Sequence, residues 1–161
     1  MRHTLLYFVL TLASMLMNLS TSFSQSGWIS QSSGTTNYLW DVCFTDANTG
    51  TVVGNNHTIL RTTDGGLSWM SQGFGENSFW GVDFTDANTG TVVGSNGTIL
   101  RTTDGGSSWT NQISGTTYGL EDVYFVDANT GTVVGGDGIV LRTTNGGSSW
   151  TSQTTGTNYS L

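Results

Sequence analysis

Apolar and polar residues alternate in short runs along most of this chain. The run LWDVCFT over 39–45 places Val42 and Phe44 on one face at a spacing of two, which is the period of a half-buried β-strand. The run TVVG over 51–54 follows the turn-forming segment DANTG at 46–50 and is too short and too β-branched for a helix. The pattern therefore predicts short strands joined by tight turns.

The same pattern occurs three times. Residues 39–69, 79–109 and 120–150 share the segment DANTGTVVG, followed after a turn by LRTT. The tryptophans that close each copy, and one that precedes the first, recur every 40 or 41 residues at Trp28, Trp69, Trp109 and Trp150. A repeat of about 40 residues made of short strands is typical of a β-propeller blade.

These repeats predict an all-β fold made of β-propeller blades. We expect three four-stranded antiparallel blades, at 38–73, 78–114 and 119–155. One extra strand is expected at 28–33, and the whole as part of a larger propeller. The segment 157–161 matches only the approach to a first strand. Two interpretations follow: the chain is a piece of a longer protein, or it is an open or self-associating array whose uncovered end blades favour association.

The turn between the third and fourth strands is the most specific part of each repeat. TTDGGLSW over 62–69 matches the Asp-box pattern Ser/Thr-x-Asp-x-Gly-x-Ser/Thr-Trp, which recurs over 102–109 and, with asparagine for aspartate, over 143–150. The side-chain oxygen accepts hydrogen bonds from turn amides, the glycine permits a positive φ, and the tryptophan buries a large ring. We expect a structural role for Asp64, Gly66, Trp69, Asp104, Gly106, Trp109, Asn145, Gly147 and Trp150.

The charge balance excludes some classes of partner. The chain has four arginines, no lysine and eleven acids, with a formal net charge of −7. Binding to nucleic acid by phosphate neutralisation needs a basic surface, and anionic membrane surfaces repel an acidic body. We therefore expect no nucleic-acid partner and no membrane association of the processed chain.

The N-terminus has the pattern of a signal peptide over residues 1–24. Arg2 and His3 precede an apolar stretch from Leu5 to Leu19, and small polar residues follow. The stretch is short for a membrane span, which needs ~20 apolar residues, and its flanks suit a signal. We expect cleavage near Ser24 and a secreted, periplasmic or extracellular protein; an uncleaved anchor is the competing interpretation.

Taken as a whole, the repeat resembles those of the photosystem II stability and assembly factor family. The matching residues are Phe-x-Asp-x-Asn-x-Gly, then Val-Gly, then Ile-Leu-Arg-Thr-Thr-Asp-Gly-Gly and Trp, over residues 28–161. The resemblance implies a bladed propeller with a non-enzymatic role in binding or assembling protein partners. Propellers of that family have about twice as many blades as this chain supplies.

Two sets of side chains are candidates for partner contact. Arg61, Arg101 and Arg142 occupy the same place in each copy; an arginine patch is associated with partner contact in the family that the chain resembles. The structural alternative is that each arginine pairs with an acid such as Asp46 or Asp86. Exposed aromatic residues also anchor partners, and Trp40 and Trp80, which align with Glu121, either do so or pack between adjacent blades.

We find no catalytic constellation and expect no cofactor and no metal site. A sialidase-like enzyme would need arginines that converge on one carboxylate, with a tyrosine nucleophile and separate acids, but the repeat spreads the arginines over equivalent places. The segment 46–50 begins like a calcium loop but lacks the further acids of an EF-hand. The leading expectation is a module for protein or cell-surface partners. A sialidase-like glycan-binding or glycan-hydrolysing propeller and a structural repeat segment of a surface adhesin are the alternatives.

Overall fold

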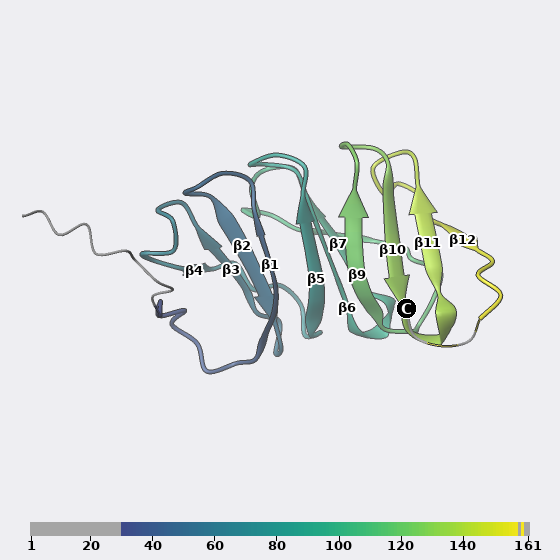
Figure 1. Ribbon diagram of the computed structural model, residues 1–161, viewed down its shortest axis with the longest axis horizontal. Coiled ribbons are helices and arrows are strands. Elements are labelled where there is room, and N and C mark those ends of the chain that lie inside the picture. Colours follow the sequence, from purple (N-terminus) through teal and green to yellow (C-terminus); the bar gives the residue numbers. More distant parts are fainter. Residues whose placement is uncertain (1–29, 158, 160–161) are drawn as a thin grey trace, which may run out of the picture. The chain divides into compact units, whose positions relative to one another are not determined.

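A computed structural model describes residues 30–157 and residue 159 of the chain. The described residues form three four-stranded antiparallel sheets, each with its strands in the order of the chain (Figure 1). This confirms the predicted all-β fold of three four-stranded blades. No helix in this part of the chain is long and apolar enough to cross a membrane.

Each sheet is one blade, and we number the blades along the chain. Blade 1 consists of β1 (Leu39–Phe44), β2 (Gly50–Gly54), β3 (Ile59–Thr62) and β4 (Met70–Ser71). Blade 2 consists of β5 (Phe79–Phe84), β6 (Gly90–Gly94), β7 (Ile99–Thr102) and β8 (Thr110–Gln112). Blade 3 consists of β9 (Leu120–Phe125), β10 (Gly131–Gly135), β11 (Val140–Thr143) and β12 (Thr151–Gln153). Single 3-10 turns at Ser95–Gly97 and Gly136–Gly138 follow β6 and β10.

A phenylalanine, a glycine and a tryptophan fix the inside of each blade. In blade 2, Phe84 at the end of β5 pairs with Gly90 at the start of β6. A Cβ on Gly90 would lie 2.5 Å from the Phe84 ring, so only glycine leaves room for that ring. The ring meets the Asp-box Trp109 edge to face, with centroids 6.3 Å apart and planes at 88°, an arrangement that aromatic pairs prefer. The equivalent ring pairs are Phe44–Trp69 and Phe125–Trp150.

Adjacent blades approach one another along their first two strands. β1 packs on β5, and β5 packs on β9. Val53 and Ile59 of blade 1 lie in one buried cluster with blade 2 residues that include Phe79 and Val82. Val93 and Ile99 of blade 2 form the corresponding cluster with blade 3 residues, which include Leu120, Val123, Phe125, Val133 and Leu141. Each core therefore lies between two blades, because one four-stranded sheet cannot bury its own apolar face.

The segment before blade 1 differs from the extra strand predicted at 28–33. Residues 30–33 form no strand, and residues 28–29, like the predicted signal peptide at 1–24, lie outside the described residues. No described strand runs beside 30–33 to complete a ladder. Gln31 nevertheless donates a hydrogen bond from Nε2 to the Gly65 carbonyl in the Asp-box of blade 1, over 3.1 Å. Gln31 thus contacts blade 1 although residues 30–33 form no strand.

Candidate partner-binding site

The structure places Arg61 between blades 1 and 2. This side chain, on β3, is only 6% exposed. Its guanidinium donates one hydrogen bond to Thr51 Oγ1 at 2.9 Å and another to the Ala87 carbonyl of blade 2. It also lies over the Phe84 ring, 5.0 Å from the centroid. Burial lowers the pKa of Arg61. The negative charge of Asp46 raises it by coulombic attraction, without a hydrogen bond between the two side chains.

Arg101 repeats this arrangement between blades 2 and 3. It donates to Thr91 Oγ1 at 2.9 Å and to the Ala128 carbonyl at 2.6 Å, and it lies 4.8 Å from the centroid of the Phe125 ring. Two of the three candidate arginines therefore hold neighbouring blades together. They bind backbone carbonyls and aromatic faces in place of the carboxylates of Asp46 and Asp86, and Arg61 in particular presents almost nothing to a partner.

Arg142 is the member of the set that remains exposed. It lies on β11 of blade 3 and lines a shallow hollow of about 210 Å³ with Thr143, Thr144 and Gln153, among others. In the described structure no further blade follows blade 3 to offer it a carbonyl or a ring. The three arginines are equivalent in sequence but not in surroundings.

A glutamine makes a second link between blades that the sequence analysis did not identify. Gln112 of blade 2 donates from Nε2 to the Gly146 carbonyl at 2.9 Å and accepts from Trp150 Nε1 at 3.3 Å. Gln72 makes the equivalent bond to Gly105 at 3.3 Å. The signal was available, because a glutamine stands three residues after each closing tryptophan, at Gln31, Gln72, Gln112 and Gln153.

The Asp-box side chains are used within their own turns. Asp104 Oδ1 accepts hydrogen bonds from Thr102 Oγ1 at 2.8 Å and from the Ser108 amide at 2.9 Å, and its Oδ2 accepts from Ser108 Oγ at 2.6 Å. These bonds, with those from Ser108 first, lower the pKa of Asp104 to about 2. Asp64 has the same partners in blade 1, and its pKa is likewise lowered to about 2. The glycine two residues on has φ of +87°, +84° and +81° at Gly66, Gly106 and Gly147.

Asn145 keeps the same geometry with neutral groups. Its Oδ1 accepts from Thr143 Oγ1 at 2.9 Å and from the Ser149 amide at 3.0 Å. Its Nδ2 donates to Ser149 Oγ at 2.9 Å, where the carboxylates of the other copies accept. The turn needs an acceptor at Oδ1 and a partner for the serine hydroxyl, and it does not need a charge.

The candidate aromatic residues stand at β-bulges. Trp40, Trp80 and Glu121 each occupy the position where the pairing of the first and second strands shifts by one residue. A bulge leaves its extra residue out of the ladder and redirects that side chain. The three side chains together line a cleft of about 380 Å³. Glu121 was noted in the sequence only as the residue aligned with the tryptophans, yet it shares their cleft.

Local contacts orient the two indole rings. Trp40 donates from Nε1 to Asn55 Oδ1 at 2.7 Å and lies 6.1 Å from the Tyr38 ring; it remains 57% exposed. The Trp80 ring lies so close over Gly119 of the next repeat that a Cβ there would collide with it. The Nε1 of Trp40 is thus hydrogen-bonded while its ring stays exposed, whereas the Trp80 ring packs against the backbone of Gly119.

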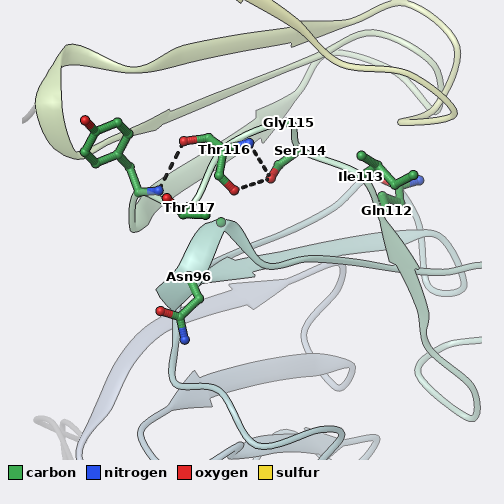
Figure 2. A pocket seen from close by; sticks show the side chains of 9 residues that line it. Asn96, Gln112, Ile113, Ser114, Gly115, Thr116 and Thr117 are labelled. Atoms are coloured by element: carbon green, nitrogen blue, oxygen red, sulfur yellow. Dashed lines mark hydrogen bonds between the residues drawn. The ribbon is translucent and has the colours of Figure 1, made fainter.

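A second hollow, of about 560 Å³, lies beside the loop from Gln112 to Tyr118 and the turn at Asn96 (Figure 2). The loop uses its polar groups on itself: Ser114 Oγ donates to the Thr116 carbonyl at 3.2 Å, and Thr116 Oγ1 accepts from the Tyr118 amide at 3.1 Å. A ligand there would compete with these bonds. The aromatic cleft with its carboxylate is the better candidate for partner contact. Among the described residues, no group of three or more metal-ligating side chains comes together.

Comparison with known proteins identifies one family. Residues 20–78 and 72–159 match the family described as photosynthesis system II assembly factor YCF48. This confirms the resemblance seen in the repeats. A comparison with curated proteins finds no match.

Solved structures give the same result. The structure of YCF48 bound to D1 peptide has a TM-score of 0.66 and 28% identity over 73% of this chain and 40% of its own. YCF48 from Cyanidioschyzon merolae has a TM-score of 0.63 and 28% identity over 72% and 37%. A GH74 enzyme from Niastella koreensis shares the fold at a TM-score of 0.57 and 20% identity, over 73% and 22%. The chain thus spans about two fifths of the length of the YCF48 structures.

Proposed function

We propose that this chain, which belongs to the photosynthesis system II assembly factor YCF48 family, is an exported, non-catalytic module that binds a segment of a protein partner. The observation that carries the proposal is the cleft formed by Trp40, Trp80 and Glu121. Aromatic side chains that are exposed yet held in place supply contact area at a small entropic cost, and such residues dominate binding energy at interfaces.

The charge of the site selects the kind of segment. Glu121 is exposed at the cleft, and the whole chain carries a formal charge of −7. A cationic side chain can lie over an indole face and pair with the carboxylate, whereas an acidic segment is repelled. The preferred partner is therefore an extended segment with an arginine or lysine beside an apolar residue. A related YCF48 protein has been solved bound to D1 peptide, which supports a peptide ligand.

A binding role accounts for the arginines better than catalysis does. Sialidase-like hydrolysis would need guanidinium groups that converge on one substrate carboxylate, but those of Arg61 and Arg101 lie in separate blade junctions. The likeness to GH74 enzymes, at 20–21% identity, concerns the fold alone. The cleft also carries a single carboxylate, that of Glu121, whereas glycoside hydrolysis ordinarily uses two.

Binding is tested on a library of short synthetic peptides that vary in charge and aromatic content. We expect retention of peptides with a basic residue next to an apolar one. Trp40→Ala should weaken that binding about tenfold, in line with roughly 1–3 kcal/mol for an aromatic anchor. Glu121→Arg should reverse the charge preference. Leu67→Ser is the matched control, because Leu67 is exposed in another turn and serine occupies its place in the other copies. Equal retention of acidic and basic peptides by the unaltered chain would refute the proposal.

Export is tested separately. The N-terminal pattern predicts removal of residues 1–24. N-terminal sequencing of the protein recovered from the medium or the periplasm should begin near Gln25. Recovery of the intact N-terminus from a membrane fraction would favour the uncleaved anchor instead.

A further inference from the structure

The two junctions between blades are built from the same parts. Each has a donor face, on the earlier blade, and an acceptor face, on the later one. The donor face supplies two aliphatic residues, an arginine and a glutamine: Val53, Ile59, Arg61 and Gln72 at the first junction, and Val93, Ile99, Arg101 and Gln112 at the second. The acceptor face supplies an apolar first strand, a phenylalanine ring, and the carbonyls of a turn alanine and an Asp-box glycine.

Blade 1 carries an acceptor face that no blade of the described residues covers. Phe44 is 46% exposed and Val42 is 54% exposed, whereas their equivalents in blade 2, Phe84 and Val82, are 7% and 5% exposed. The Phe44 ring still meets Trp69 edge to face at 6.2 Å. The face therefore has the internal arrangement of the closed junctions and lacks only the cover.

Blade 3 carries the matching donor face. Val134 and Val140 are partly exposed, although their equivalents Val53 and Ile59 are fully buried. Arg142 is exposed on the same face, and the Gln153 side chain turns back to the Thr151 carbonyl of its own strand at 3.3 Å. The arginine, the glutamine and the two aliphatic residues of the inner donor faces are thus present here without a partner blade.

We propose that two copies of this chain dock head to tail at both ends, so that the donor face of blade 3 in each copy covers the acceptor face of blade 1 in the other. Arg142 would then lie over Phe44 of the second copy and donate to the Ala47 carbonyl, as Arg61 does to Ala87 and Arg101 to Ala128. The surfaces are complementary because they continue an interface that the chain already forms twice within itself.

The number of copies follows from the number of blades. A donor face that meets an acceptor face is a heterologous contact, which gives a ring if it closes and a filament if it does not. Propellers close with typically four to eight blades. Two copies of the described blades supply six, whereas one copy supplies three and three copies would supply nine. Two is thus the copy number that closes within this range.

One contact must be exchanged on docking. The Gly65 carbonyl, where Gln153 of a second copy would bind, already accepts the exposed hydrogen bond from Gln31. Because residues 30–33 pair with no strand, Gln31 can yield this carbonyl with little loss of structure. Gln31 forms no hydrogen bond with the other described groups of the acceptor face.

The test is the molar mass of the full chain in solution, by light scattering after size exclusion, over a wide range of protein concentration. We expect twice the mass of one chain. Arg142→Glu on the donor face and Val42→Asp on the acceptor face should each shift the equilibrium to single chains, and both residues are exposed, so the variants should fold. Leu67→Ser should leave the mass unchanged, because the equivalent Ser107 stays exposed beside an inner junction. All variants share one N-terminus, so association through residues 1–24 would affect them equally.

Mixing the two variants tests the direction of docking. A mixed pair contains one junction with both faces unaltered, whereas each variant alone contains none, so the mixture should form two-chain species that neither variant forms alone. A single chain at every concentration, an open series of larger species, or a pair insensitive to both substitutions would overturn the proposal. A mixture that stays single would exclude the head-to-tail arrangement.

Discussion

The guanidinium of Arg101 in blade 2 lies 4.8 Å from the centre of the Phe125 ring in blade 3. The same ring meets Trp150 of its own blade edge to face, with ring centroids 6.0 Å apart. One aromatic ring thus connects the core of a blade to the blade before it. The arginine of the LRTT segment therefore joins neighbouring blades at Arg61 and Arg101, and this makes its removal a sensitive test of the structure.

Arg101→Ala should lower the free energy of unfolding by about 2–3 kcal/mol, because it removes two hydrogen bonds and a contact of a cation with an aromatic face. Denaturation in urea, followed by tryptophan fluorescence, measures the change. Thr103→Ala, an exposed position two residues on, is the control and should stay within about 0.5 kcal/mol. An equally small effect of Arg101→Ala would show that this arginine contributes little to holding the two blades together.

Asp104→Asn should be tolerated far better than Asp104→Ala. Asn145 shows that an amide keeps the Oδ1 contacts and finds a partner in the serine hydroxyl. Alanine leaves the Thr102 hydroxyl and the Ser108 amide without their acceptor. Thermal unfolding at neutral pH should give a melting temperature somewhat below that of the parent for asparagine, which lacks the charge, and a much lower one for alanine. An equal loss in the two variants, both of which remove the charge, would mean that charge and not geometry stabilises the turn.

The acid stability of the chain should depend on its two Asp-box carboxylates. The pKa values of Asp64 and Asp104 fall from an ordinary 3.8 to about 2 in the folded chain. A lowered carboxyl pKa stabilises the fold above the unfolded value, and that contribution is lost as the pH falls from near 4 through 2. Burial raises the pKa of Asp83, so this carboxyl has the opposite effect on the dependence of stability on pH.

The asparagine variant isolates this contribution. Melting temperatures of the parent and of Asp104→Asn between pH 6 and pH 2 should converge as the pH falls, since the variant has no proton to take up at this turn. Parallel curves would contradict the assignment.

His57→Gly should stabilise the chain. His57 has φ of +53°, whereas its equivalents Gly97 and Gly138 have +67° and +68° in the same turn. The left-handed region costs a residue with a Cβ about 1–2 kcal/mol, which outweighs the roughly 0.4–1 kcal/mol by which glycine favours the unfolded chain through its greater freedom. We expect a gain of roughly 0.5–1 kcal/mol in urea denaturation. Asn56→Gly at φ of +52° is the matched control and should gain less, because asparagine tolerates this region.

The sequence predicted the blades because their signals are local. The run DANTGTVVG marks a turn and a strand wherever it occurs, and an Asp-box draws its hydrogen bonds from residues within five positions. The family followed from the same residues. The strand predicted at 28–33 did not form over the described 30–33, because a strand needs a neighbour that the local pattern cannot supply.

The surroundings of equivalent residues could not be predicted in this way. Arg61, Arg101 and Arg142 stand in nearly the same local sequence, yet the first is buried and the last is exposed, because the carbonyl and the ring that receive an arginine come from the next blade. The cleft is a similar case: Trp40, Trp80 and Glu121 lie 40 or 41 residues apart and meet through three bulges and the packing of three sheets. The sequence by itself determined the repeat, the turns and the strands, whose bonds are short in sequence. Only the tertiary structure decided which faces are covered and which side chains a partner can reach, since those contacts join residues from different blades.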